Sequence, residues 1–381
     1  MASIVKAQRP LRILFVSSTT SGGSGRSQRE LASALGDIGV ETKLLADDGD
    51  GQAITRYLFE QILDASVRFK NTALGAPTAW LRSLPGRQPT ERSDLLVSVA
   101  PENAFRDIAV TFRPDIVVGS SISRPTWNAI RSACATLELP AVLYLREEAA
   151  LGHFDSGQGT HDAVIANSRT LVESARKRGV EAHFIPSIVD LEASRTKTSR
   201  ECVLLVNPRP EHGVAIAEEL AKSYPTINFV LQESWQLTED EQRNVEGILA
   251  RNSNVEFRPR NTNPAEIFRD AAVLLAPHQI DNRPRTILEA LSNAIPVVCS
   301  DQPGLIESTG GGGLVVETRL GIAGWRDALE RVWQDPQLYR QLQNNAKDFS
   351  QRAEVQPDTI VRDFVAVLKQ TMIDRAAVVL P

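Results

Sequence analysis

The stretch LRILFVS at residues 11–17, followed by STTSGGSGR at 18–26 and SQRELASAL at 27–35, indicates how the chain folds. The first, apolar run predicts a buried strand. In the last segment Leu31, Ala32 and Leu35 have the spacing of one helical face. A buried strand that leads through a glycine-rich turn into a helix is typical of an α/β protein.

The same alternation of short apolar runs and amphipathic segments continues along the chain. Further strands are expected at residues 41–46, 114–119, 140–145 and 163–166, and then at 202–206, 228–232, 255–257, 272–276 and 296–299. Near-continuously apolar strands separated by helices indicate parallel sheets covered on both faces. We therefore expect two Rossmann-like domains that face each other across a cleft, where open α/β sheets bind ligands.

Domain boundaries follow from breaks in this rhythm. The polar stretch 192–200 is the best linker, which places an N-terminal domain at residues 1–190 and a C-terminal domain at 191–345. Residues 346–381 are expected to form a helical tail. Residues 54–104 interrupt the alternation with Tyr57, several other aromatic residues, prolines and glycines, and we interpret them as an insertion that shapes a site.

Composition limits the classes of function. With 42 Lys and Arg residues against 47 Asp and Glu residues, the net charge of -5 argues against a general nucleic-acid binder but not against a local phosphate site. No run approaches the about 20 apolar residues that span a bilayer. Residues 1–10 also lack the apolar core of a secretion signal. We expect a cytoplasmic protein, for which peripheral membrane contact and a homodimer stay open.

The first candidate binding segment is the glycine-rich stretch after the first strand. Gly22 and Gly23 would let a ligand phosphate approach the following helix N-terminus. The stretch is not a P-loop, and Gln28 stands where a dinucleotide-binding fingerprint has its third glycine. A flexible strand–helix turn is the alternative interpretation.

The second candidate segment is VNPRPEHG at residues 206–213, again between a strand and a helix. Arg209 offers a planar, permanently charged fork suited to phosphate oxygens. His212 could add a donor whose charge depends on pH. A proline-rich turn with a solvated Arg209 is the alternative.

The third candidate segment is DNRPRTILE at residues 281–289. Pro284 suits the first turn of a helix, so the backbone N–H groups of Arg285 and Thr286 should point outward at the helix start. Asp281 before this helix and Glu289 within it could hold the hydroxyls of a sugar and a ribose while phosphates lie between them. An exposed acidic pair on a helix edge is the alternative.

At this third segment the sequence resembles the retaining, GT-B-fold glycosyltransferases of family 4, the glycosyl transferases group 1. These proteins share an acidic–seven–acidic motif followed by Glu-Ala and a Pro-Val-Val strand. Other landmarks agree in order, namely IANS at 165–168, IPSIVD at 185–190, PEHG at 210–213 and PGLIE at 303–307. The resemblance covers residues 11–345.

The resemblance implies transfer of a sugar from a nucleotide-diphosphate sugar to an acceptor hydroxyl, with retention of configuration and without an obligatory metal or other cofactor. The C-terminal half would bind the donor, and the N-terminal half a glycan, lipid-linked or small-molecule acceptor. Glu289 would bind the donor ribose and Asp281 the transferred sugar, while Gly22 and Gly23 border the reacting centre. The diphosphate would be neutralised by Arg209 and His212 and by the helix start at Arg285 and Thr286.

Several positions depart from the family pattern. Arg283 and Pro284 replace phenylalanine–glycine, and His212 replaces a lysine. Where the family has a histidine after the fourth strand, this chain has Arg146 and Glu147, which with Tyr57 are candidates on the acceptor side. The candidate catalytic residues are Asp281, Glu289, Arg209 and, a few residues after Glu147, His153, for which a surface or capping role is the alternative. The remaining histidines are not spaced as metal ligands, so no metal site is expected.

Two other functions stay open at this point. A GT-B-type sugar-nucleotide epimerase or hydrolase would turn over a nucleotide sugar without an acceptor. A non-catalytic nucleotide-sugar-binding partner in glycan assembly would bind the ligand without transfer, and the altered motif residues favour it.

Overall fold

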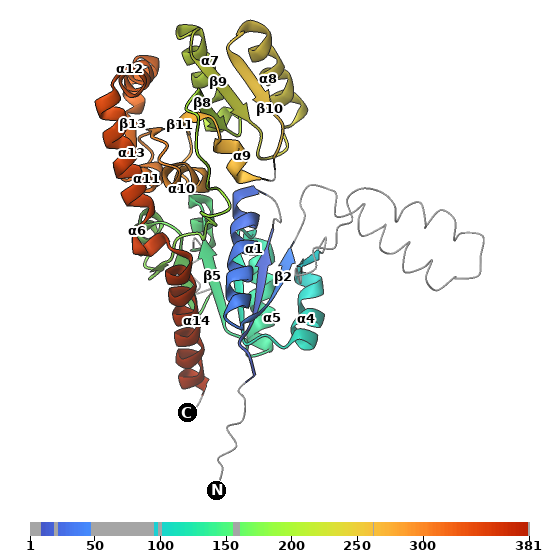
Figure 1. Cartoon of the computed structure of the whole chain (residues 1–381). Helices are drawn as coiled ribbons and strands as arrows, with labels where there is room; N and C mark the ends of the chain where they lie inside the picture. The colour runs from blue at the N-terminus through green and yellow to red at the C-terminus, as the bar shows by residue number, and fades with distance from the viewer. Residues whose placement is uncertain are drawn as a thin grey trace, which may run out of the picture.

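The computed structural model describes residues 9–18, 22–46, 95–97, 101–154, 161–261 and 263–379. Two α/β domains lie one above the other, the N-terminal domain below in Figure 1, and each is built on a parallel sheet with helices on both faces. The predicted fold class, two Rossmann-like domains facing across a cleft, is confirmed.

The N-terminal sheet has the strand order β3-β2-β1-β4-β5-β6-β7, with every pair parallel. The chain moves outward from β1 to β3 and then crosses to β4 on the other side of β1, which creates the switch point where such sheets bind ligands. Its strands are β1 (Arg12–Ser17), β2 (Glu41–Ala46), β3 (Leu95–Val97), β4 (Ile116–Ser120), β5 (Ala141–Leu145), β6 (Ala163–Ala166) and β7 (His183–Phe184). Its helices are α1 (Gly22–Asp37), α4 (Pro101–Phe112), α5 (Arg124–Thr136), η1 (Glu148–Phe154) and α6 (Arg169–Arg176).

The C-terminal sheet has the order β10-β9-β8-β11-β12-β13 and is also parallel. Its strands are β8 (Cys202–Val206), β9 (Asn228–Gln232), β10 (Val255–Arg258), β11 (Ala271–Ala276), β12 (Val297–Ser300) and β13 (Gly313–Val316). Its helices are η2 (Pro210–His212), α7 (Val214–Ser223), α8 (Glu239–Arg251), α9 (Pro264–Phe268), α10 (Arg285–Ser292), α11 (Pro303–Thr309), η3 (Thr318–Leu320), α12 (Gly321–Gln334) and α13 (Pro336–Ser350).

Each sheet has a separate apolar core on each face, because alternate side chains of a strand point to opposite sides. In β1, Leu14 and Val16 pack toward α4 and α5, whereas Ile13 and Phe15 pack on the opposite face. The central strand of the C-terminal sheet, β8, divides its side chains between two cores in the same way. All the strands expected in this half are found within two residues of the predicted bounds.

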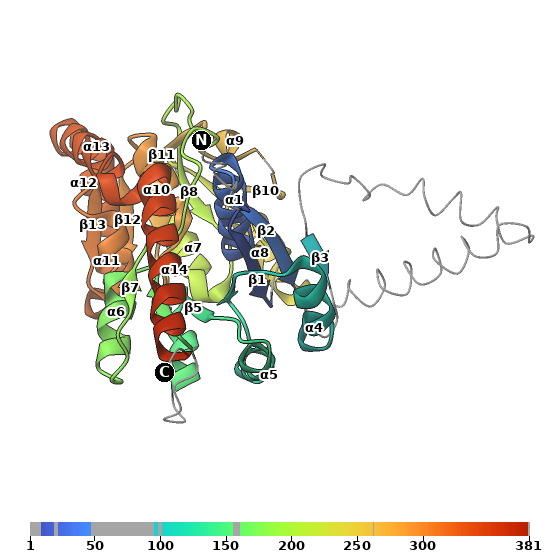
Figure 2. The same ribbon diagram turned by 90° about the horizontal axis from the view of Figure 1, so that it is seen from below.

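The end of the chain returns to the N-terminal domain. After α13 and the short helix η4 (Ala353–Val355), α14 (Pro357–Val379) runs beside α1, as Figures 1 and 2 both show. Phe364 packs against Phe15 and Tyr144, with ring centroids 6.1 and 6.2 Å apart. The expected tail over 346–381 therefore begins inside a helix of the C-terminal domain and ends in the N-terminal core. In the described part of the chain no helix is both long enough and apolar enough to cross a membrane.

Two segments differ from the prediction. Helix α1 begins at Gly22 rather than at Ser27, so the glycines expected to form a loop belong to its first turns. Residues 95–97 form the edge strand β3 and residues 101–104 begin α4, so these parts of the expected insertion over 54–104 belong to the sheet and its helix layer. Its other residues, Tyr57 included, lie outside the described residues.

Candidate active site

A cavity of about 500 Å³ lies between the two domains. Its N-terminal wall consists of the start of α1 and the loops that follow β4, β5 and β6, and its C-terminal wall of the loops that follow β8 to β11 and the start of α10. Both walls are the carboxyl ends of parallel strands, where α/β sheets bind ligands. The position therefore agrees with the cleft expected from the sequence.

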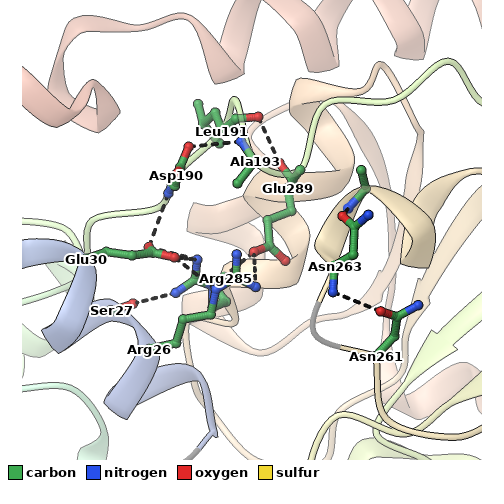
Figure 3. Close-up of polar contacts among 12 residues, drawn as sticks. Arg26, Ser27, Glu30, Asp190, Leu191, Ala193, Asn261, Asn263, Arg285 and Glu289 are labelled. Carbon is green, nitrogen blue, oxygen red and sulfur yellow. Dashed lines mark hydrogen bonds and ion pairs between the residues drawn. The ribbon is translucent and has the colours of Figure 1, made fainter. Parts of the chain in front are cut away.

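Glu289 is the most deeply buried carboxylate in the cavity wall, with 2% of its surface exposed. It lies just over one turn inside α10, whose first turn begins after Pro284 as predicted. Its Oε1 accepts a hydrogen bond from Arg285 Nε at 3.0 Å and lies 3.5 Å from Arg26 Nη1 (Figure 3). The other oxygen, Oε2, has no partner among the described residues, so it is left to accept from a ligand hydroxyl.

Arg285 joins α10 to the N-terminal domain. Its Nη2 donates to both carboxylate oxygens of Glu30 in α1, at 2.8 and 2.9 Å, and its Nη1 donates to Ser27 Oγ at 3.2 Å (Figure 3). Arg26 Nε also pairs with Glu30 Oε1 at 2.9 Å. A Cβ on Gly23 would lie 3.6 Å from Arg285 Cδ, so the start of α1 approaches α10 closely.

Two histidines lie side by side in the C-terminal wall. The ring centroids of His212 and His278 are 4.5 Å apart, and both side chains are buried. Burial lowers the pKa of His212 and lowers that of His278 to about 4, so both rings are neutral at pH 7. Because His212 Nδ1 donates to the carbonyl oxygen of Asn207 at 3.1 Å, its Nε2 is an acceptor in the neutral ring. His212 Nε2 can therefore act as the expected hydrogen-bond donor only when the ring is protonated.

Arg209, the residue expected to bind the phosphates, does not line the cavity. Its Nη2 donates to the carbonyl oxygen of Gln236 at 3.0 Å, and its guanidinium lies over the ring of Trp235 at 5.3 Å. Its Nε is 3.5 Å from a carboxylate oxygen of Glu241. These partners keep the guanidinium of Arg209 out of the cavity lining, whereas Trp235 itself lines the cavity.

Two other predicted residues also lie outside the cavity lining. Asp281 Oδ1 accepts a hydrogen bond from the backbone N–H of Gly304 at 2.7 Å, and burial raises the pKa of this carboxyl. His153 is buried against the loop after β4, where its Nε2 contacts the carbonyl oxygen of Ile122 at 3.0 Å. One polar atom of each side chain is therefore held by a backbone group.

The cavity nevertheless brings together residues from all three candidate segments. The predicted residues in its lining are Gly23, Arg146, Glu147, His212, Arg285, Thr286 and Glu289. Gly22 begins α1 next to Gly23. Within the described ranges no group of three or more His, Cys, Asp or Glu side chains could hold a metal ion.

Sequence reasoning missed Arg26, Trp235 and Asn167, which also line the cavity. Arg26 belongs to the quoted glycine stretch, so its position was available as a signal. Trp235 follows β9 closely, and a tryptophan shortly after the carboxyl end of a predicted strand is a second usable signal. In the structure its side chain is 36% exposed. Asn167 is the third residue of the IANS segment, whose resemblance to the family was noted without a role for the side chain.

Two Rossmann-like domains with a ligand cavity between them define the GT-B architecture, and comparisons with known proteins agree. Residues 215–349 match the family model Glycosyl transferases group 1. No curated protein matches the chain in sequence.

Solved structures match nearly the whole chain, at low identity. Sucrose-phosphate synthase from Thermosynechococcus elongatus is 14% identical with a TM-score of 0.72, covering 96% of this chain and 100% of its own. Anabaena HepE in complex with UDP-glucose is 14% identical with a TM-score of 0.69, covering 94% and 100%. The catalytic domain of starch synthase IV from Arabidopsis thaliana, bound to ADP and acarbose, is 10% identical with a TM-score of 0.66, covering 96% and 100%. The chain has the GT-B fold.

Proposed function

We propose that this protein is a glycosyltransferase that moves a sugar from a nucleotide-diphosphate sugar to an acceptor hydroxyl, with retention of configuration and without a metal ion. The observation that carries the proposal is Glu289, a buried carboxylate with one free oxygen in an interdomain cavity, next to the N-terminal end of α10. The match of residues 215–349 to Glycosyl transferases group 1 supports it, as does the complex of the similarly folded HepE with UDP-glucose.

In this proposal the donor binds along the C-terminal wall. Glu289 Oε2 accepts a hydrogen bond from a ribose hydroxyl, and the diphosphate lies at the start of α10, near the N–H groups of Arg285 and Thr286. The exposed ring of Trp235, on the same wall, provides an apolar face for the nucleobase. His212 accepts a proton when a phosphate approaches, because a neighbouring negative charge raises its pKa.

Cationic side chains then stabilise the leaving group. Negative charge grows on the diphosphate as the glycosidic bond breaks, and Arg285 and Arg26 lie at this end of the cavity. Both are held by Glu30 before any ligand arrives, so they need little reorganisation. A preorganised donor of this kind lowers a barrier by about 3 kcal/mol.

The acceptor binds on the N-terminal wall, near Gly23 and Glu147. Retention follows if the acceptor hydroxyl attacks the face from which the leaving group departs and a donor phosphate oxygen takes its proton. Holding both substrates between the domains supplies orientation and excludes water. We assign Arg209, Asp281 and His153 to the support of the surrounding loops and not to substrate contacts.

Binding of nucleotides to the whole chain tests this proposal. Isothermal titration calorimetry with UDP, ADP and GDP in EDTA-containing buffer should show one nucleoside diphosphate bound. Glu289→Gln should weaken that binding at least tenfold, because the acceptor for a ribose hydroxyl is altered. Glu219→Gln, an exposed carboxylate on α7, is the matched control and should bind as the unmodified chain does. Unchanged affinity in Glu289→Gln would contradict the site assignment.

Product analysis separates transfer from the two alternatives. Incubation of a nucleotide sugar with a mixed acceptor pool should give a glycoside whose anomeric configuration matches that of the donor, as read by proton NMR. Turnover of the nucleotide sugar without an acceptor would select the epimerase or hydrolase. Tight binding without turnover would select the non-catalytic binding partner.

A further inference from the structure

Arg146 is a buried cation in the N-terminal wall of the cavity. It follows β5 directly and is 8% exposed. Its Nε donates to Ser120 Oγ and its Nη1 to Ser187 Oγ, both at 2.8 Å, and its guanidinium lies over the ring of Tyr144 at 4.3 Å. Two hydroxyls and an aromatic face thus fix the position of the guanidinium. N–H groups on Nη1 and Nη2 remain to donate to another partner.

Among the described residues, no carboxylate forms an ion pair with this guanidinium. No carboxylate of the described residues lies within 4.0 Å of Arg146, whereas the comparably buried Arg285 pairs with both Glu30 and Glu289. Burial lowers the pKa of Arg146, which shows that its charged form is poorly solvated, although a guanidinium stays charged at neutral pH. A buried charge is normally paired. Here the pairing is left to a ligand in the cavity.

Asn167 provides an independent observation beside Arg146. It is 3% exposed, and its Nδ2 donates to the carbonyl oxygen of Arg146 at 3.1 Å and reaches Ser187 Oγ at 3.4 Å. Its Oδ1 is buried and has no partner in the described part of the chain. Buried polar atoms without a hydrogen bond are uncommon in proteins. The wall thus offers cationic donors and, adjacent to them, a free acceptor.

The described part of the cavity lining is rich in arginine. Among the residues that the structure describes, six arginines line it, namely Arg26, Arg29, Arg146, Arg260, Arg283 and Arg285. The carboxylates near them among the described residues are Glu147 and Glu289 in the lining, Glu30 behind it, and Glu307 and Glu354 close to Arg283. A sugar nucleotide carries a single negative charge on each of its two phosphates. In the proposed function both phosphates lie at the start of α10 beside Arg285 and Arg26, so Arg146 is available for a further anionic group.

We propose that the sugar bound against Arg146 carries a carboxylate, as a uronic acid does, either in the transferred sugar or in the acceptor. This inference rests on the proposed glycosyltransferase function and names its substrate class. The planar carboxylate accepts hydrogen bonds from the remaining N–H groups of the Arg146 guanidinium, and a neighbouring sugar hydroxyl donates to Asn167 Oδ1. Arg146 is therefore a specificity-determining residue that contacts substrate.

Matched ligand pairs that differ only in the carboxylate test this proposal on the full chain. In the donor arm, calorimetry compares UDP-glucose with UDP-glucuronate and GDP-mannose with GDP-mannuronate. In the acceptor arm, methyl glucoside is compared with methyl glucuronide in the presence of the nucleoside diphosphate that binds. We expect the carboxylate ligand to bind at least tenfold more tightly in one arm, which identifies the source of the carboxylate.

Two variants assign the preference to this site. Arg146→Gln should bring the ratio of the two affinities close to one. Arg260→Gln, which removes an exposed arginine from the same lining, should weaken both members of a pair alike and keep their ratio. If Arg146→Gln does not fold, Arg146→Lys replaces it and should reduce the ratio by losing the planar fork.

The outcomes are distinguishable from those for the proposed function. Equal affinity for both members of every pair, with a nucleoside diphosphate bound, overturns the carboxylate proposal alone. A preference that persists in Arg146→Gln also overturns it. Failure of the folded chain to bind any nucleoside diphosphate contradicts the proposed function, and this inference with it.

Discussion

Arg285 of α10 and Glu30 of α1 form a two-hydrogen-bond ion pair, at 2.8 and 2.9 Å, across the two domains. The same guanidinium donates to Glu289, the carboxylate to which we assign the donor ribose. One side chain therefore connects the donor carboxylate to the opposite domain. We therefore expect binding at Glu289 and the relative position of the domains to be coupled through this contact.

The ion pair predicts a measurable coupling energy. Glu30→Gln and Arg285→Gln should each lower the free energy of unfolding by about 2 kcal/mol, because each removes one of the two ion-pair partners of a largely buried charge. The double variant should lose at least about 1 kcal/mol less than the sum. Urea titrations of the four proteins check this expectation. Strictly additive losses would show that the two charges do not interact.

Gly23 should matter for binding and not for stability. A Cβ there would make only an ordinary 3.6 Å contact with Arg285, and α1 gains from replacing glycine by alanine, so Gly23→Ala should unfold no more easily than the unmodified chain. Its methyl group narrows the N-terminal wall at the proposed acceptor position and should raise the KM for the acceptor about threefold to tenfold in a transfer assay. Gly36→Ala, in the same helix with nothing within 4 Å, is the control and should stabilise without affecting this KM.

Gly213 should be indispensable to the turn that carries His212. Its φ is +76°, and a Cβ would lie 2.3 Å from the carbonyl oxygen of Pro277. Gly213→Ala should therefore cost about 3 kcal/mol or more, combining left-handed strain with a backbone clash. Gly39→Ala, at φ +82° with open space around it, isolates the strain and should cost about 1 kcal/mol. Similar losses in the two variants, measured by urea titration, would contradict this account.

His278 should make stability depend on pH. Its pKa is lowered from 6.5 to about 4 in the folded protein, so between these values the unfolded chain binds more protons. Titration of His278 therefore leaves the free energy of unfolding unchanged above pH 6.5. As the pH falls from 6.5 toward 4, it lowers the free energy of unfolding by about 1.4 kcal/mol per pH unit, and by up to about 3 kcal/mol in all. The slope of unfolding free energy against pH over this range should be shallower in His278→Gln. Parallel curves for the two proteins would show that the ring does not titrate as described.

Much of the fold could be predicted because the strands are buried on both faces and read as continuous apolar runs. The strand at 202–206, for example, has the same bounds in the sequence analysis and in the structure. The start of α1 could not be predicted, because glycine disfavours helices. Gly22 and Gly23 are nevertheless helical, in the turn where α1 meets Arg285 of the other domain.

For the candidate site, the sequence predicted which segments meet but not every side-chain direction. The segments follow strands, and parallel topology brings the carboxyl ends of those strands together. The directions of Arg209 and Asp281 depend on partners distant in sequence, Trp235 with Gln236 for the former and Gly304 for the latter. No local pattern indicates such partners.

The return of the chain through η4 to α14 has a mechanical consequence. The polypeptide passes between the domains twice, near residues 186–189 and again near 352–355, and both passages line the same small cavity. Two domains joined by neighbouring connections along one edge rotate about the line through those connections. We therefore expect the cavity mouth to widen for substrate on the edge away from these two connections.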